Sequence, residues 1–231
     1  MKFREVWNEP EPCPYLPDQV ARMPLRVPAR VLTPDELDTQ LGAGDRRTGR
    51  LLYKTACDAC NACEPLRVSV SDFSPSKSQR RVWRRNIDEL RITMGRPRVD
   101  QLRVDLFNRH KLERGLSRSG EAMTPESYRQ WLVESCCHTA EVDYWEGDRL
   151  LAVSIIDIGL TTASSVYHYF DPDAASRSLG VFSALAELAW LKSQSYQWYY
   201  LGLYVRACDR LNYKSDFRPH QRLVGDVWVQ G

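Results

Sequence analysis

The spacing of hydrophobic residues along this chain predicts helices and strands in both halves, and hence a mixed α and β fold. Thr33-Pro34-Asp35-Glu36 combines an N-cap threonine, a proline at the first helical position and a glutamate at the third, so a helix is expected to begin there. Ser76 and Thr124 precede two further helical patterns. Apolar stripes predict two more helices, near residues 102–114 and over residues 179–193.

Strands are predicted where polarity alternates or where an apolar run is short. Glu146-Gly147-Asp148 lies between two such runs and predicts the turn of a hairpin. The predicted strands span residues 66–70, 89–93, 141–145, 150–158, 165–170, 198–203 and 223–229. The order from residue 89 onward is therefore strand, two helices, three antiparallel strands, helix, strand, short helix, strand.

This order of elements resembles the fold of the Gcn5-related N-acetyltransferases. We therefore expect an α+β chain with a small cysteine-containing N-terminal domain at residues 1–86. An acetyltransferase-like domain with a central, mostly antiparallel sheet is expected at residues 87–231. In that fold an acyl donor lies where two central strands separate. Its pyrophosphate meets the loop before the central helix, because backbone N–H groups at a helix N-terminus hold anions.

The loop before the long predicted helix departs from the acetyltransferase pattern. Acetyltransferases usually have Arg/Gln-x-x-Gly-x-Gly/Ala there, whereas this chain has Arg177-Ser178-Leu179-Gly180-Val181-Phe182. Phe182 stands where a small residue lets the pyrophosphate approach. The departure argues against coenzyme A bound in the usual manner and favours another acyl carrier.

Three of the seven cysteines lie at a two-residue spacing, in Cys57-Asp58-Ala59-Cys60-Asn61-Ala62-Cys63. Such a run can surround one soft metal ion or cluster, and Cys13 is the natural fourth ligand. Two interpretations are open. The four residues could hold a structural zinc ion or iron–sulfur cluster that stabilises the proline-rich N-terminal region, or they could be four reduced structural thiols.

The composition is that of an ordinary globular protein, with 43% hydrophobic and 27% charged residues. The chain has no run of about 18 apolar residues, which a membrane-spanning helix would need. Its N-terminus lacks the apolar core of a signal peptide. An odd number of cysteines would leave one thiol unpaired in an oxidising compartment. These features predict a cytoplasmic protein with no membrane partner.

The net charge of +2 conceals a strongly basic segment. Between Lys77 and Arg118 there are thirteen Lys and Arg residues against five Asp and Glu, and eleven of the thirteen are Arg. Arginine suits bidentate contact with phosphate. The segment therefore indicates a polyanion site, with a solvated helix face as the simpler alternative.

Several strings resemble, in their order and spacing, those of one enzyme family. They are Cys13-Pro14-Tyr15-Leu16, Arg46-Arg47-Thr48-Gly49 with Tyr53-Lys54, the cysteine triplet, Phe73-Ser74-Pro75-Ser76-Lys77-Ser78-Gln79-Arg80-Arg81, Phe170-Asp171-Pro172-Asp173, Arg177-Ser178-Leu179-Gly180, Tyr200-Leu201-Gly202, and Asn212-Tyr213-Lys214 with Phe217-Arg218-Pro219. Together they cover nearly the whole chain. They resemble the bacterial aspartate/glutamate leucyltransferases, a branch of the aminoacyl-tRNA–protein transferase family related to the eukaryotic arginyltransferases. Asp45 and Gly115 depart from the family pattern.

The resemblance implies transfer of leucine from leucyl-tRNA to the α-amine of proteins that begin with Asp or Glu, which marks them for degradation through the N-degron pathway. The reaction requires no cofactor and no covalent intermediate, so positioning and electrostatic stabilisation should supply most of the rate. The ends of the central strands are the expected place for the reacting groups. Asp171 is the candidate amine acceptor or base, Tyr204 a polar group near the ester, and Tyr169 a weaker candidate. Each could equally be a structural residue.

The acidic side chain of the acceptor needs cationic partners, since a desolvated carboxylate is otherwise costly. The candidate partners are Arg46, Arg47, Lys54, Lys214 and Arg218. The tRNA phosphates are assigned to Lys77, Arg80, Arg81, Arg84 and Arg85. The four histidines are scattered without ligand spacing and receive no role.

Three alternatives stay open at this point. The donor could be arginyl-tRNA, which the sequence alone does not separate from leucyl-tRNA. The chain could be an N-acetyltransferase that uses coenzyme A, against which Phe182 argues. It could also be a non-catalytic, metal-stabilised RNA-binding module, which would bind RNA in a salt-dependent way without transferring an amino acid.

Overall fold

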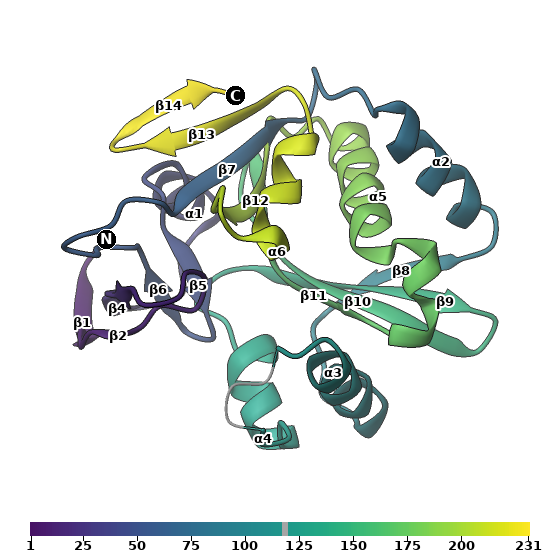
Figure 1. Ribbon diagram of the computed structural model, residues 1–231, viewed down its shortest axis with the longest axis horizontal. Coiled ribbons are helices and arrows are strands. Elements are labelled where there is room, and N and C mark those ends of the chain that lie inside the picture. Colours follow the sequence, from purple (N-terminus) through teal and green to yellow (C-terminus); the bar gives the residue numbers. More distant parts are fainter. Residues whose placement is uncertain (117–119) are drawn as a thin grey trace.

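The computed structural model describes residues 1–116 and 120–231, so Arg118 of the predicted basic segment lies outside the described residues. Within them the largest unit is an eight-stranded sheet, in which β11 and β12 are parallel and the other neighbours antiparallel. Its strands in spatial order (Figure 1) are β14 (Val227–Gln230), β13 (His220–Val224), β7 (Glu64–Ser69), β12 (Trp198–Tyr204), β11 (Thr162–Phe170), β10 (Arg149–Ile158), β9 (Thr139–Glu146) and β8 (Arg91–Gly95). The expected mixed chain with a large, mostly antiparallel sheet is confirmed.

Helices cover both faces of this sheet, as Figure 1 shows. On one face, Phe182 of α5 packs against Trp83 of α2 with ring centroids 5.8 Å apart. On the other face, Tyr169 of β11 contacts Phe107 of α3. The helices are α1 (Pro34–Gly42), α2 (Lys77–Asn86), α3 (Gln101–Glu113), α4 (Pro125–Tyr128) with the π-turn η1 (Arg129–Val133), the 3₁₀ turn η2 (Pro172–Arg177), α5 (Leu179–Ser193), α6 (Asp209–Asn212) and the 3₁₀ turn η3 (Tyr213–Asp216). None of the helices in the described residues is both long and apolar enough to cross a lipid bilayer.

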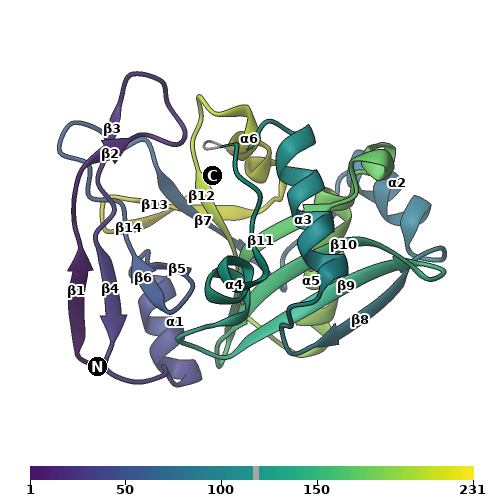
Figure 2. The same ribbon diagram turned by 90° about the horizontal axis from the view of Figure 1, so that it is seen from below.

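A second sheet of order β1–β4–β6–β5 lies beside the large one (Figure 2). Its strands are β1 (Phe3–Trp7), β4 (Leu25–Pro28), β6 (Leu51–Tyr53) and β5 (Arg46–Thr48), and the short strands β2 (Glu11–Pro12) and β3 (Val20–Ala21) pair with each other. The hydrophobic pattern did not predict these strands, because they are short and several contain or adjoin proline. Helix α1 connects β4 to β5 and buries Leu37 and Leu41.

Several predicted elements are confirmed. Helix α2 begins after Ser76, whose hydroxyl accepts the backbone N–H of Gln79 at 3.3 Å, and α5 spans residues 179–193 as expected. The prediction of one strand over residues 223–229 is wrong. Gly225 adopts a φ of +60° there and reverses the chain, so β13 and β14 form a hairpin.

The boundary expected at residue 86 falls among elements that belong to the large sheet. β7 pairs with both β12 and β13, and α2 packs against α5. Strand pairing therefore places residues 64–69 with the large sheet, whereas the small sheet ends at β6. The division of the chain into two domains stays a prediction.

β11 and β12 separate within the large sheet. Among the described residues, their pairing stops at Ser164 and Tyr200, although the strands continue to Phe170 and Tyr204. On its other side, β12 has a bulge opposite β7, where Gly202 adopts a φ of +92°. Positive φ favours glycine, so this residue lets β12 bend away from its neighbour.

Arg47 of β5 joins the small sheet to the large one. Its Nε lies 2.8 Å from Oδ2 of Asp157 in β10, and both side chains are only 1% exposed. Asp157 also accepts a hydrogen bond from the hydroxyl of Thr139 at 2.7 Å. Burial opposes the charge of Arg47, but the carboxylate of Asp157 outweighs it, and the pKa of Arg47 is raised above its ordinary value. This ion pair therefore holds the two sheets together.

The Asp157→Asn variant is expected to lose about 3 kcal/mol of unfolding free energy, because the charge of Arg47 would stay buried without a counter-charge. The matched control is Asp226→Asn, since Asp226 is 93% exposed and pairs with Lys54 at the surface. Its loss should be below about 1 kcal/mol. Chemical denaturation followed by circular dichroism measures both values, and similar losses in the two variants would contradict the role given to Arg47.

Candidate functional site

A cavity of about 930 Å³ opens where β11 and β12 separate. Its size lies within the range of about 300–1,000 Å³ that is typical of ligand sites. The separating strands line it with Ser164, Ser165, Val166, Tyr167, His168 and Phe170 from β11, and with Leu201, Gly202 and Leu203 from β12. The start of α5, strand β5 and turn η3 also line it, together with residues from the N-terminal segment, the end of α3 and α6. Backbone groups freed from strand pairing are available there to a ligand.

Arg46 of β5 reaches into this cavity and is only 6% exposed. Its Nη2 donates to the carbonyl oxygen of Ser165 at 3.1 Å, whereas Nη1 is buried without a hydrogen-bond partner among the described residues. The nearby Asp157 pairs with Arg47 instead. Burial lowers the pKa of Arg46, yet arginine stays protonated at neutral pH. The cavity thus contains a buried positive charge with one unused donor, which a carboxylate would satisfy.

Lys214 of η3 is a second buried cation beside Arg46. Its Nζ donates to the carbonyl oxygen of Leu203 at 2.8 Å. A methyl group on Gly202 would lie 3.1 Å from Nη2 of Arg46 and 3.3 Å from Nζ of Lys214, so the two cationic tips meet at one point of β12. Burial, with the charge of Arg46 adding to it, lowers the pKa of Lys214 to about 7.

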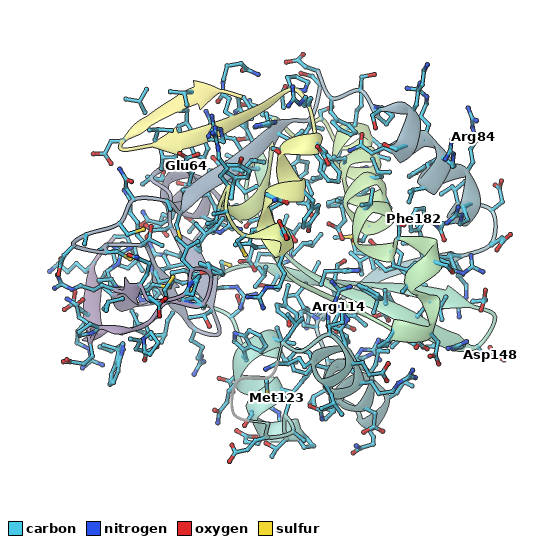
Figure 3. The ribbon with its side chains drawn as sticks, viewed as in Figure 1. Glu64, Arg84, Arg114, Met123, Asp148 and Phe182 are labelled. Atoms are coloured by element: carbon cyan, nitrogen blue, oxygen red, sulfur yellow. The ribbon has the colours of Figure 1, made fainter. Side chains whose placement is uncertain are left out.

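The charged residues of the wall are mostly basic. In the described part of the chain, Glu9 and Glu11 are the acidic residues of the wall, and both are exposed. The basic ones are Arg46, Arg47, Lys111, Arg114, Arg210 and Lys214. Arg114, labelled near the centre of Figure 3, follows the last residue of α3. The interior therefore favours a ligand with negative charge.

Two histidines add neutral polar groups to the wall. Nδ1 of His168 lies 2.9 Å from Oγ of Ser154, and its Nε2 is buried without a partner among the residues described. Nδ1 of His110 lies 3.0 Å from the carbonyl oxygen of Phe170. Burial lowers the pKa of His168 to about 3 and that of His110 to about 4, so both rings are neutral at pH 7.

The start of α5 borders the cavity through Ser178, Leu179, Gly180 and Val181. Phe182 does not share this wall. It is fully buried between Trp83 and Tyr144, on the side of α5 that faces α2 (Figure 3). The expectation that Phe182 stands in the way of coenzyme A is therefore wrong, because its side chain points into the core.

The three predicted catalytic residues lie outside the described wall of the cavity. Asp171 is buried and bonded to two arginines, with Nε of Arg149 3.1 Å from its Oδ2. Tyr169 faces α3, and its hydroxyl lies 2.6 Å from that of Tyr128. Tyr204 belongs to the apolar core. These contacts give all three structural partners, and their catalytic roles stay predictions that the geometry does not support.

Of the five residues expected to recognise the acceptor, Arg46 and Lys214 come together in the cavity. Arg47 also lines it, but its charge is neutralised by Asp157. Lys54 lines a separate, smaller pocket. Arg218 is exposed and donates to a backbone carbonyl of its own turn. Neither of these two lies in the described wall of the large cavity.

The five cations predicted to bind tRNA are all exposed on α2, and Figure 3 shows Arg84 on its outer side. They are Lys77, Arg80, Arg81, Arg84 and Arg85. The end of α2 reaches the segment that borders the cavity. Nδ2 of Asn86 donates to the carbonyl oxygen of Arg177 at 2.9 Å, and Arg85 bonds the carbonyl oxygen of Ser176. The basic face of α2 therefore leads toward the cavity.

The four cysteines of the predicted metal site are half-buried and carry free thiols. Cys63 is influenced by the other three, and burial together with these neighbours raises the pKa of its thiol to about 12. Within residues 1–116 and 120–231, no group of three or more His, Cys, Asp and Glu is arranged so that it could hold a metal ion. A structural zinc ion or iron–sulfur cluster at Cys13, Cys57, Cys60 and Cys63 stays a prediction.

Sequence reasoning missed the backbone role of Gly202 and the position of His168. A signal for the glycine existed, because a glycine inside an otherwise apolar strand marks a bulge or a close approach. The sequence contains no comparable signal for His168, because its partner Ser154 lies on a neighbouring strand.

Comparison with known proteins gives the family. The model described as "Arginine-tRNA-protein transferase, N terminus" matches residues 11–81, and the one described as "Arginine-tRNA-protein transferase, C terminus" matches residues 102–224. The aspartate/glutamate leucyltransferase of Vibrio campbellii is 36% identical over 224 residues, which cover 94% of this chain and 92% of that protein. That of Nitrosococcus oceani is 35% identical over 222 residues, which cover 96% and 93% of the two chains.

Among solved structures, "The structure of L-PGS from Bacillus licheniformis" is similar with a TM-score of 0.46 and 14% identity, over 62% of this chain and 45% of that one. The family models and the sequence relatives, by contrast, cover both halves of the chain. The chain therefore belongs to the arginine-tRNA-protein transferase family and is a transferase enzyme.

Proposed function

We propose that this enzyme transfers leucine from leucyl-tRNA to the α-amine of proteins that begin with Asp or Glu, and so creates a degradation signal in the cytoplasm. The observation that carries the proposal is the buried pair of cations, Arg46 and Lys214, in the cavity between β11 and β12. The relatives are aspartate/glutamate leucyltransferases, which suggests the two substrates, and the geometry offers a physical reason for each.

The acceptor is recognised through its side-chain carboxylate. Nη1 of Arg46 is buried and unpaired, and charge-assisted hydrogen bonds are about twice as strong as neutral ones. A first residue with an amide in place of the carboxylate would leave the positive charge of Arg46 without a counter-charge. An acidic first residue is therefore selected over Asn or Gln of the same shape.

The donor is recognised by the absence of charge on its side chain. Tyr167, Val166 and Leu203 offer apolar surface in the wall, whereas the basic residues there would repel an arginyl side chain. The two glutamates that could bind such a side chain are exposed at the rim. This distribution of charge favours leucine over arginine as the transferred amino acid.

The fold offers a place for each part of the reaction. The splayed pair β11 and β12, followed by α5, is the arrangement in which an acetyltransferase-like fold holds its acyl group. We assign the aminoacyl ester to this opening and the phosphates of the tRNA to the exposed face of α2. Because the donor ester is already activated, orientation of the amine and stabilisation of the oxyanion supply most of the rate.

The first test is the transfer itself. The enzyme is incubated with leucyl-tRNA or arginyl-tRNA and with peptides that differ only in the first residue, which is Asp, Glu, Asn or Lys. We expect a leucyl adduct, detected by mass spectrometry, on the Asp and Glu peptides alone. Failure of every charged tRNA to modify these two peptides would contradict the proposed function, and preferential transfer of arginine would contradict the donor assignment.

The second test separates the candidate acceptor residues. The Arg46→Met variant should raise the KM for an Asp peptide about 10- to 100-fold, because a hydrogen bond to a charged group contributes about 1.5–3 kcal/mol. Lys54→Met is the matched control, since Lys54 lies in another pocket and should change KM less than about twofold if it binds no substrate. Steady-state kinetics with saturating leucyl-tRNA measures both. A larger effect at Lys54 would place the acceptor elsewhere.

The third test concerns α2. The double variant Arg81→Glu/Arg84→Glu should raise the KM for leucyl-tRNA, and the salt dependence of binding should weaken by about one to two units of the log–log slope. Lys2→Glu/Arg4→Glu makes the same charge change at the start of β1, where Lys2 precedes the strand and Arg4 lies in it, on the opposite side of the molecule from α2 (Figure 1). Equal losses of tRNA affinity in the two double variants would show only an effect of total charge.

A further inference from the structure

We propose that Lys214 is the general base of the reaction, and that the acidic side chain of the acceptor switches this base on. The inference rests on the proposed function and assigns different tasks to the two buried cations. Arg46 holds the carboxylate of the acceptor, and Lys214 removes a proton from its α-ammonium group. Recognition of an acidic residue and activation of the amine would then be one event.

The surroundings of Lys214 make its ammonium group easier to deprotonate than one in water. Its side chain is buried, and Nζ donates to the carbonyl oxygen of Leu203. The guanidinium of Arg46 from β5 lies close to it. Cys208, which precedes α6, acts the other way and favours the protonated form of Lys214. Tyr200 of β12 and Tyr53 of β6 act on the charge of the adjacent Arg46. A buried ammonium beside a guanidinium loses its proton more readily than one in water.

The pKa of Lys214 agrees with this geometry, since burial and Arg46 lower it to about 7. A general base is most effective when its pKa lies near the working pH. The other titratable side chains close to the opening fit the task less well. His168 and His110, with pKa values of about 3 and 4, are too weakly basic, and Asp171 lies outside the described wall.

The acceptor itself completes the base. When its carboxylate binds at Nη1 of Arg46, a negative charge arrives at the guanidinium whose other nitrogen, Nη2, converges with Nζ of Lys214 on Gly202. This charge offsets the repulsion between Arg46 and a protonated Lys214, and so favours proton transfer to Nζ. A neutral first residue would supply no such charge, and a smaller fraction of its α-amine would be deprotonated.

The step balances without another reactant. The α-ammonium gives one proton to Nζ of Lys214, and the nitrogen lone pair forms a C–N bond with the ester carbonyl carbon of leucyl-tRNA. The second amine proton passes to the ribose oxygen as the C–O bond breaks, which yields the amide and a tRNA with a free terminal hydroxyl. Lys214 returns its proton to water after the product leaves.

The test asks whether position 214 must supply a base or only a positive charge. Lys214→Arg keeps a cation at this position but removes the base, so we expect kcat for an Asp peptide to fall at least about 100-fold, with KM changed by less than about threefold. Arg46→Lys should show the reverse, a raised KM with kcat nearly kept. A Lys214→Arg variant that keeps kcat within about threefold of the wild type would overturn the proposal and leave Lys214 as a binding residue.

A second measurement does not depend on whether the larger arginine side chain of the Lys214→Arg variant fits in the cavity. The Lys214→Ala variant is assayed with added ethylamine or methylamine, after its thermal unfolding has confirmed that it is folded. We expect these primary amines to restore turnover in proportion to their concentration, and guanidine not to do so. Equal rescue by guanidine would show that only charge is needed and would overturn the inference. Failure of the wild-type enzyme to modify any Asp or Glu peptide would instead contradict the proposed function.

Discussion

The structure depends on the different environments of two neighbouring arginines in β5. Arg47 enters the large sheet and meets Asp157, so its charge is neutralised and the two sheets are held together. Arg46 enters the cavity, where its Nη1 has no partner in the described part of the chain. The ion pair of Arg47 holds β5 in place, and so it also positions the adjacent Arg46, which stays available to a ligand. A buried charge of this kind is costly for stability, and a substrate carboxylate is what would compensate it.

The large sheet supplies the space that this arrangement needs. β11 and β12 are paired only where they begin, and the bulge of β12 at Gly202 leaves room for the tips of Arg46 and Lys214. A side chain at Gly202 would both require an unfavourable φ and crowd the two cations. The opening of the strands, the glycine and the cationic pair thus act as one unit. An amine and an ester that bind there are brought together at a point lined by freed backbone groups.

Much of the fold could be predicted from the sequence, because the longer elements carry strong local signals. The capping residues Thr33 and Ser76 mark the starts of two helices, and the apolar stripe of α5 gives its full length. The small sheet could not be predicted, since its strands are too short for a periodic pattern, and β1–β4 and β4–β6 pair strands that are distant in sequence. β7 was recognised as a strand, but only its pairing with β12 and β13 reveals that it belongs to the large sheet.

The candidate site was predictable only in part, for the same reason. Arg46 and Lys214 could be proposed from the need for cations, but the sequence does not show that they meet at Gly202 or that Lys54 and Arg218 lie elsewhere. Asp171 stands at the end of a central strand as expected, yet its carboxylate is bound by arginines. The sequence therefore predicts that Asp171 ends a strand. It does not predict that arginines bind its carboxylate, because these partners are distant in sequence.

The central claim is that the unpaired donor of Arg46 receives the side-chain carboxylate of the acceptor. The most direct test is a crystal structure of the enzyme with a bound peptide that begins with Asp. We expect a carboxylate oxygen about 3 Å from Nη1 of Arg46, with the α-amine directed toward Nζ of Lys214. A carboxylate bound instead at Lys54 or Arg218, with Arg46 still unpaired, would contradict it.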